Sequence, residues 1–330
     1  MLFPELAPSG LVGIARLAAD SDVIEAKRRV EYLDLTTRSF FSRPSGRKMP
    51  FDWQINPYRG CEFGCKYCYA RYTHEFMELR ETWQFEQKIF IKDFNEAAFR
   101  HDLARIPTED AIAIGTATDP YQPAERRFGR TRRILEIFAG ENGRTFSVTT
   151  KSDLVARDAD LLGYIARRNV LHVLITITTT DEQLARLVEP YAPRPRLRLE
   201  AVQSLAAAGV RVLVLANPVM PLITDSVKNL SAVASGAAGA GAVYMMGAVL
   251  FLKPCAQKAF FPFLEEQYPH LVKKYRERYE RGAWIRGPYE DLIAKRVSEI
   301  RNRFGLTQKP GRYEPDLWAG EPQLPLFDTK

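Results

Sequence analysis

Three cysteines lie within eight residues of this 330-residue chain, as Cys61-Glu-Phe-Gly-Cys65-Lys-Tyr-Cys68. Thiolates are soft ligands that select zinc, copper(I) or iron-sulfur clusters. Gly60 and Gly64 allow tight backbone turns, so we expect the three thiolates to point at one centre. The pattern therefore predicts a metal centre held by Cys61, Cys65 and Cys68.

The number of donors distinguishes the possible centres. Three thiolates on a four-iron cubane leave one iron open to a substrate, as a catalytic zinc keeps one position open. A structural zinc site needs a fourth donor, and the paired CxxC spacing typical of such sites is absent. His74 could be that donor or a hydrogen-bonded packing residue. A zinc-binding nucleic-acid module built on the cysteines and His74 is thus an alternative hypothesis.

The CxxxCxxC spacing, with the aromatic Tyr67 before the last cysteine, resembles the radical S-adenosylmethionine (SAM) superfamily. The resemblance implies a [4Fe-4S] cluster on the three cysteines, whose unique iron chelates the amino and carboxylate groups of SAM. Reduction by a flavodoxin- or ferredoxin-like donor would then release a 5'-deoxyadenosyl radical. Such a radical removes hydrogen atoms that are too weakly acidic for a base.

Within the superfamily, the chain is most similar to the spore photoproduct lyase-like group, which includes DNA repair photolyase-like members. The similarity covers most of the chain. It is carried by residues 56–71, 73–75, 118–123, 150–151, 175–179 and 218–225, together with Glu125.

The resemblance also implies cofactor contacts at the ends of predicted strands. Tyr67 would lie against the adenine, Lys151 and Thr176 would contact the carboxylate or ribose, and residues 216–220 would flank the adenine. Carboxylates accept hydrogen bonds from ribose hydroxyls or an amino group, although helix capping is an equal alternative for these acids. The predicted cofactor-binding residues are Tyr67, Thr118, Asp119, Glu125, Lys151, Thr176, Ala216 and Pro218.

One position departs from the lyases. There, a cysteine after the second barrel strand returns a hydrogen atom to the product radical, whereas this chain has Thr116-Ala117-Thr118. The thymine-dimer reaction is therefore in doubt. Cys255 and Tyr121 are the candidate catalytic residues that would donate hydrogen in its place, and a buried packing role is the alternative for Cys255.

From Phe51 onward, short β-rich runs alternate with helical patterns, as in βα units. Ligands bind at the carboxyl ends of parallel strands, so the turns after these runs should converge on one site. The predicted fold is α/β, a partial (β/α)6 TIM-like barrel with an N-terminal extension and a C-terminal helical region. The predicted strands are 53–56, 111–115, 145–149, 172–178, 210–216 and 242–250, with 86–91 as an extra strand.

The predicted organisation has four parts. Residues 1–50 form an extension with one short helix and a linker, residues 51–258 the barrel, and residues 259–308 helices that cover its open side. The flexible tail, 309–330, contains Gln323, Leu324, Leu326 and Phe327 in the order QLPLF. That peptide resembles the segment by which bacterial DNA repair and replication proteins bind the sliding clamp.

Composition narrows the class of protein. With 46% hydrophobic and 26% charged residues, the chain should fold as a soluble globule. Neither an apolar run of roughly 18 residues nor a signal-peptide pattern occurs, and a lone cysteine beside a group of three makes no disulfide framework. We therefore predict a cytoplasmic protein without membrane contact.

The net charge of +7 and basic runs such as 126–127 and 194–198 favour polyanions, although solvated helix faces are an equal alternative. The resulting hypothesis is a radical SAM enzyme whose leading substrate is a nucleic-acid lesion or a nucleotide. A radical SAM enzyme acting on a peptide or small metabolite is the alternative. The sequence alone does not identify which hydrogen atom is abstracted, whether SAM is consumed or regenerated, the physiological reductant or the oligomeric state.

Overall fold

The computed structural model describes residues 11–21, 23–27, 30–44, 49–311 and 313–315. Its centre is a seven-stranded sheet in the order β11-β10-β9-β8-β7-β4-β3, in which the first six strands are parallel and β3 is antiparallel. The predicted partial (β/α)6 barrel is confirmed. The strands are β3 (Phe41–Ser42), β4 (Trp53–Ile55), β7 (Ala111–Ile114), β8 (Thr145–Thr150), β9 (Val170–Thr176), β10 (Arg211–Leu215) and β11 (Tyr244–Met246).

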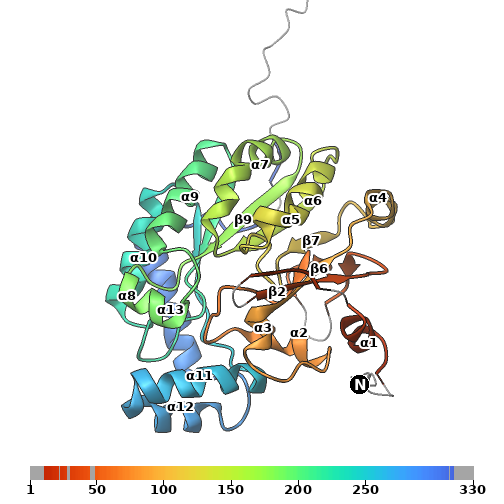
Figure 1. The fold of residues 1–330 in the computed structure, drawn as a ribbon. Coiled ribbons are helices and arrows are strands. Elements are labelled where there is room, and N and C mark those ends of the chain that lie inside the picture. Colours follow the sequence, from red (N-terminus) through yellow and green to blue (C-terminus); the bar gives the residue numbers. More distant parts are fainter. Residues whose placement is uncertain (1–10, 22, 28–29, 45–48, 312, 316–330) are drawn as a thin grey trace, which may run out of the picture.

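Helices connect the parallel strands and cover the sheet (Figure 1). Six of the seven residues of β9 are buried, as expected for a parallel strand covered on both faces. Helix boundaries follow local signals: the Asp181 carboxylate caps α8, and Pro195 begins α9. The connecting elements are α5 (Glu125–Phe128), α6 (Arg130–Phe138), the 3-10 helix η2 (Asp153–Asp158), α7 (Ala159–Ala166), α8 (Glu182–Val188), α9 (Pro195–Ala207) and α10 (Val227–Gly239).

A second, four-stranded sheet has the order β1-β2-β6-β5. The extra strand predicted at 86–91 is β6, but it belongs to this sheet rather than to the barrel. The N-terminal extension contains the expected short helix, α1 (Ile14–Ala19). It also supplies strands, where the prediction had a linker. One of them, β2, is part of the packed structure, because its Tyr32 and Leu35 side chains are completely buried. The bounds are β1 (Val23–Lys27), β2 (Val30–Leu35), β5 (Tyr58–Arg59) and β6 (Lys88–Lys92), followed by α4 (Glu96–Ala104).

The C-terminal helical region begins at Pro254, slightly earlier than predicted. Helices α11 and α12 share a buried apolar cluster with the cysteine segment, in which Phe63 and Tyr67 join Phe260 and Tyr275. Helix α13 packs against α10 and β11, the last strand of the sheet. The elements are α11 (Pro254–Gln267), the 3-10 helix η3 (Pro269–Leu271), α12 (Val272–Tyr279) and α13 (Pro288–Arg303).

The end of the described chain returns to the amino ends of the strands. The Tyr313 hydroxyl accepts a hydrogen bond of 3.0 Å from the Leu171 amide, beside a cavity of about 650 Å³. The clamp-like peptide with Gln323, Leu324, Leu326 and Phe327 lies outside the described residues. Among the helices that the structure describes, none is long and apolar enough to cross a membrane.

Candidate functional site

The cysteine loop, residues 60–68, lies between β5 and the 3-10 helix η1 (Tyr69–Arg71), which leads into α2 (Tyr72–Glu75). Its backbone is anchored at two points that are distant in the chain. The Cys61 amide donates a 2.9 Å hydrogen bond to the carbonyl of Phe85 in α3 (Gln84–Gln87), and the Lys66 amide donates one of 2.9 Å to the Val188 carbonyl. The loop is therefore fixed between the small sheet and the barrel.

Two glycines shape this loop, as predicted. Gly60 and Gly64 have φ angles of +84° and +64°, which side-chain-bearing residues rarely adopt. A Cβ atom on Gly60 would lie 2.8 Å from the Lys88 carbonyl oxygen, and one on Gly64 would lie 2.9 Å from the Tyr191 ring. Glycine is therefore required at both positions by conformation and by space.

The three predicted metal ligands lie in one electrostatic environment. Cys61 and Cys65 are buried and Cys68 is half-buried. Burial is the main cause that raises the pKa of each thiol, that of Cys65 to about 12. The negative charge of Asp119, and then of the other two cysteines, adds to the rise at Cys61, and Glu189 and then Cys68 add to the rise at Cys65. Because bare thiolates are unfavourable here, a cationic metal centre would be needed to keep them deprotonated.

This donor set fits an iron-sulfur cluster better than one metal ion. In the described part of the chain, no three His, Cys, Asp or Glu side chains converge closely enough to hold a single ion. Thiolates on separate corners of a cubane need not meet at one point. The set is therefore compatible with a cluster that has one open corner.

His74 does not complete a zinc site. Its Nε2 lies 3.0 Å from the Lys88 carbonyl oxygen, and its ring packs edge-on against Phe85 and Phe90. Burial lowers its pKa to about 4. These contacts favour the packing alternative for His74 and give no support to a zinc module that uses it.

Tyr67 is held by a buried polar group that the sequence did not predict. Its hydroxyl donates to the Glu189 carboxylate, which also accepts a 2.9 Å bond from the Thr178 hydroxyl. Arg198 pairs with Glu189 at 2.6 Å and donates a 3.0 Å bond to the Thr176 carbonyl. Burial alone would raise the pKa of Glu189, but Arg198 and then Lys151 outweigh it and hold that pKa below its ordinary value.

Lys151 follows β8 and extends to the same place. Its Nζ lies 5.6 Å from the centroid of the Tyr67 ring, and among the described residues no carboxylate lies within ion-pairing distance of it. Asp119 fixes the local backbone, because its carboxylate accepts 2.6 Å bonds from the Lys151 amide and the Thr150 hydroxyl. Lys151 is thus a positioned cation beside the cysteine loop.

Thr118 and Gln122 hold the start of that loop. The Thr118 hydroxyl and the Gln122 amide donate bonds of 2.6 and 3.0 Å to the Gly60 carbonyl, and Gln122 accepts a 3.0 Å bond from the Glu62 amide. The side chains of Thr118 and Asp119 therefore position the loop and the end of β8, while their contacts with the cofactor stay predictions.

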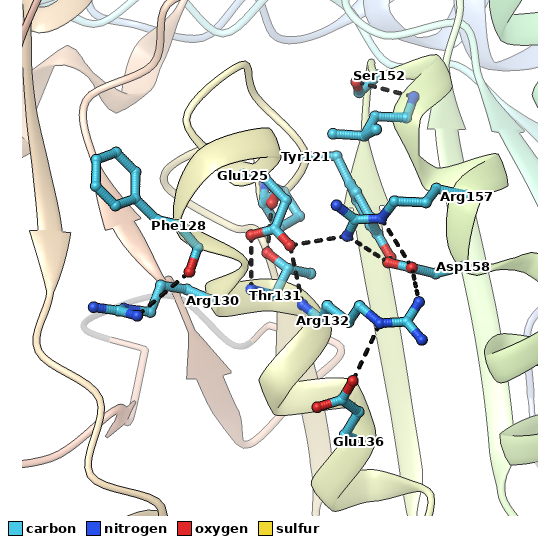
Figure 2. A network of polar contacts seen from close by, with 12 residues as sticks. Tyr121, Glu125, Phe128, Arg130, Thr131, Arg132, Glu136, Ser152, Arg157 and Asp158 are labelled. Atoms are coloured by element: carbon cyan, nitrogen blue, oxygen red, sulfur yellow. Dashed lines mark hydrogen bonds and ion pairs between the residues drawn. The ribbon is translucent and has the colours of Figure 1, made fainter.

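Glu125 and Tyr121 lie in a different environment, the Glu125 cluster, which consists of Tyr121, Glu125, Arg132, Arg157 and Asp158 (Figure 2). The Tyr121 hydroxyl donates a 3.1 Å bond to Asp158. Glu125 is fully buried and accepts bonds from the Tyr58 hydroxyl, two backbone amides and Arg157. These groups are committed to the fold, so the structure gives no support to Glu125 as a cofactor ligand or to Tyr121 as a hydrogen donor.

The remaining predicted residues lie at strand ends. Thr176 ends β9 and is paired in register with Leu215, which immediately precedes Ala216. Pro218 follows by a cis peptide bond from Asn217. The parallel register thus brings Thr176, Ala216 and Pro218 to the carboxyl edge of the sheet. Their contacts with the cofactor remain predictions.

Cys255 lies in the first turn of α11. It is buried, and its Sγ atom lies 3.7 Å from the carbonyl oxygen of Tyr69, one residue after Cys68. The fourth cysteine is therefore close to the cysteine loop although 187 positions separate it from Cys68 in the sequence.

Gln122, Glu189 and Arg198 were missed as site residues. Gln122 lies inside a segment that carried the family resemblance, so it could have been found. Arg198 falls in the basic run 194–198, for which phosphate contact or a solvated face was expected, but it is 1% exposed. Nothing in the local pattern distinguishes it from Arg194 and Arg196, which form exposed ion pairs.

Comparison with known proteins identifies similar chains. The family model described as the Radical SAM superfamily matches residues 55–230. An uncharacterized protein of Mycobacterium tuberculosis is 33% identical over 288 residues, covering 86% of this chain and 84% of the relative. An uncharacterized protein of Methanocaldococcus jannaschii is 27% identical over 68% of this chain and 77% of its own length.

Among solved structures, spore photoproduct lyase complexed with dinucleoside spore photoproduct is similar. The TM-score is 0.60 at 15% sequence identity, and the match covers 83% of this chain and 78% of the lyase. A mutant of the lyase with bound AdoMet and the same dinucleoside has a TM-score of 0.57 at 15% identity and the same coverage. The shared feature is the fold.

Proposed function

Because the chain belongs to the radical SAM superfamily, we propose that Cys61, Cys65 and Cys68 hold a [4Fe-4S] cluster that binds SAM, and that the enzyme acts on a nucleic-acid lesion or a nucleotide. The observation that supports the first part is the group of three thiols, buried or half-buried, in one glycine-shaped loop, which no further His, Asp or Glu side chain joins in a single-ion site among the described residues. When bound and reduced, the cluster and SAM supply a 5'-deoxyadenosyl radical for hydrogen abstraction.

The chain's own residues would bind and shield the cofactor. We expect the Lys151 ammonium to pair with the SAM carboxylate, because it lies beside the Tyr67 ring and forms no ion pair among the described residues. Glu189 and Arg198 hold the Tyr67 ring in place, so that this ring can pack against the cofactor. The apolar side chains of α11 and α12 exclude water from the loop.

Cys255 is proposed to return a hydrogen atom from its thiol to the product radical, which would leave a thiyl radical on Cys255. It lies next to the residue that follows Cys68, whereas the hydroxyl of Tyr121, the other candidate, is bonded to Asp158. The loop after β7 has no cysteine, so we do not extend the proposal to the thymine-dimer reaction.

Support for a nucleic-acid substrate is indirect. The fold is similar to that of spore photoproduct lyase complexed with dinucleoside spore photoproduct, and the chain carries a net charge of +7. At this sequence identity the likeness concerns fold alone, and function is decided by the site. The substrate needs its own experiment.

The test begins with anaerobic purification and analysis of iron and sulfide. We expect a brown protein with about four irons and four sulfides, and 5'-deoxyadenosine after addition of dithionite and SAM. A protein with one zinc and no sulfide would overturn the proposal. Turnover is then compared with undamaged DNA, ultraviolet-damaged DNA and a peptide mixture. A gain only with peptides would replace the nucleic-acid substrate by the alternative.

Two partners belong to the same proposal. The cluster requires a flavodoxin- or ferredoxin-like electron donor, and the tail residues Gln323, Leu324, Leu326 and Phe327 are proposed to bind the bacterial sliding clamp. Pull-down of purified clamp by the full chain, compared with a Leu326→Ala, Phe327→Ala double variant, tests the second partner. Equal retention by both proteins would exclude this contact.

A further inference from the structure

Five aromatic rings form a continuous strip that starts next to the cysteine loop. We call Phe76, Tyr72, Tyr69, Phe251 and Trp284 the aromatic strip. Successive ring centroids are separated by 5.5, 6.5, 6.1 and 4.1 Å in that order. The rings come from three distant segments: η1 with α2, the connection from β11 to α11, and the connection from α12 to α13.

Three rings of the strip are exposed and two, Tyr72 and Phe251, are half-buried, whereas other aromatic groups near the loop are buried. Phe76 is 62% exposed, Tyr69 40% and Trp284 42%, whereas Tyr67, Phe260 and Tyr275 are buried. Core packing therefore does not explain why these rings gather. Exposed apolar groups that adjoin one another are characteristic of binding surfaces.

The strip is also rigidly held. The Tyr69 hydroxyl donates to the Thr116 carbonyl at the end of β7, which places this ring at the carboxyl edge of the barrel. A 2.9 Å bond from the Leu252 amide to the Ala283 carbonyl ties the segment of Phe251 to that of Trp284. A surface fixed in this way loses little conformational freedom when a ligand binds.

Cations lie on the rings. The Lys253 Nζ is 3.9 Å from the Tyr72 centroid and 5.8 Å from that of Phe251, and the Arg286 guanidinium is 4.8 Å from the Trp284 centroid. Arg286 also forms an exposed ion pair with Glu290, but among the described residues no carboxylate pairs with Lys253. Positive charge on the protein's side of the rings repels a cationic ligand and favours one that combines planar groups with negative charge.

Nucleotides have that combination, and unpaired ones expose the faces of their bases. We infer that the aromatic strip binds an unpaired stretch of nucleic acid, with bases against the exposed surfaces of its rings and phosphates at Lys253. The inference rests on the proposed function, because it assigns the surface that presents a nucleic-acid substrate to the site beside Cys68. Paired bases in a duplex hide these faces, so the surface selects unpaired or extruded nucleotides.

The chain contains a matched control. Tyr164 on α7 is 36% exposed and has the Arg168 guanidinium 4.8 Å from its ring centroid, so it reproduces an aromatic ring with a cation away from the strip. If any exposed aromatic ring with a cation contributes to binding, Tyr164→Ala and Trp284→Ala should lower the affinity for nucleic acid equally. If the aromatic strip is the binding surface, only Trp284→Ala should lower it.

The experiment measures fluorescence anisotropy of a labelled single-stranded 12-mer and its duplex with anaerobically purified protein. We expect the single strand to bind more tightly than the duplex. Trp284→Ala should weaken binding of the single strand about tenfold, the typical loss for one stacking residue. Trp284→Phe should largely restore binding, and Tyr164→Ala should have the wild-type affinity.

Charge is tested separately by salt dependence. Lys253→Gln should lower the slope of log affinity against log salt concentration by about one, as expected for a single lost phosphate contact. Equal affinities for single strand and duplex, or equal losses in Trp284→Ala and Tyr164→Ala, would overturn the inference. So would Trp284-dependent binding to phosphatidylserine vesicles without binding of the single strand.

The same wild-type preparation is analysed for iron, sulfide and cleavage of SAM without nucleic acid. Cleavage without strand binding would refute the strip and leave the radical SAM assignment intact. Strand binding by a protein that holds no iron would refute the proposed cofactor chemistry and leave the strip as a nucleic-acid surface. The two failures are therefore distinguishable.

Discussion

The cysteine loop and the Glu125 cluster are both buried polar regions, but their charges are satisfied differently. In the cluster, the carboxylates of Glu125 and Asp158 are matched by arginines, a tyrosine hydroxyl or backbone amides. At the loop, burial raises the pKa of all three thiols, and the Lys151 ammonium forms no ion pair with a carboxylate in the described chain. Buried polar groups that are fully matched support the fold, whereas those left unmatched are prepared for a ligand.

The strongest way to break this contrast is Cys65→Ala. Removal of one of only three ligands should abolish iron retention and production of 5'-deoxyadenosine, because the cluster has no replacement donor in the loop. Cys255→Ala is the matched control and should keep its iron content. Iron and sulfide analysis of both variants checks this, and full iron in Cys65→Ala would contradict the assignment of ligands.

Glu125→Gln tests the Glu125 cluster, the region in which the buried charges are matched. The neutral amide cannot match Arg157 and directs an NH2 group towards donors, so we expect a loss of about 3 kcal/mol in the free energy of unfolding. The exposed Glu136→Gln, which removes a partner of Arg132, should change stability by less than about 0.5 kcal/mol. Urea denaturation measures both changes. SAM affinity of folded Glu125→Gln should stay unchanged, and its loss would restore Glu125 to the site.

His74 tests whether a buried residue next to the cysteine loop can belong to the fold rather than to the site, because its contacts are those of a packing residue. Burial lowers its folded pKa to about 4, below the unfolded value of about 6.5, so the unfolded chain binds more protons between these values. Stability should therefore fall by about 1.5 kcal/mol between pH 6.5 and pH 5 on account of His74. His74→Gln should reduce this dependence in urea titrations, and an unchanged profile would argue against a neutral buried ring.

Lys151→Met gives the smallest expected effect. Loss of one charge-assisted contact should weaken SAM binding roughly tenfold while iron content is retained. The exposed Lys228→Met serves as control and should bind SAM like the wild type. Equilibrium dialysis with labelled SAM makes the comparison. Equal affinity of the Lys151 variant and the wild type would remove this lysine from the cofactor site.

The fold was predictable where the local pattern was strong. Apolar runs identified all six parallel strands, although β11 ends at Met246 rather than Leu250. The small sheet was missed because the pairing of β2 with β6 joins segments that are more than 50 residues apart. Local patterns carry little information about such pairing.

The site divided in the same way. The CxxxCxxC spacing identified the three cysteines, because the predicted metal ligands lie close together in the chain. Glu189 and Arg198 could not be found, because their role depends on a buried contact with Tyr67 that only the fold creates. The bonds of Tyr121 to Asp158 and of Glu125 to Tyr58 are likewise created by the fold, so the sequence alone did not reveal them.

During protein synthesis, the cysteine loop can be covered only after the distant residues that bind it have been translated. Residues 60–68 leave the ribosome early, yet the Val188 carbonyl, the Glu189 carboxylate and the helices that cover the loop are translated much later. At about 5–20 residues per second, this interval lasts on the order of ten seconds or more. Until Tyr279 has emerged, the thiols stay open to oxidants, so loading of the metal centre belongs to the finished chain.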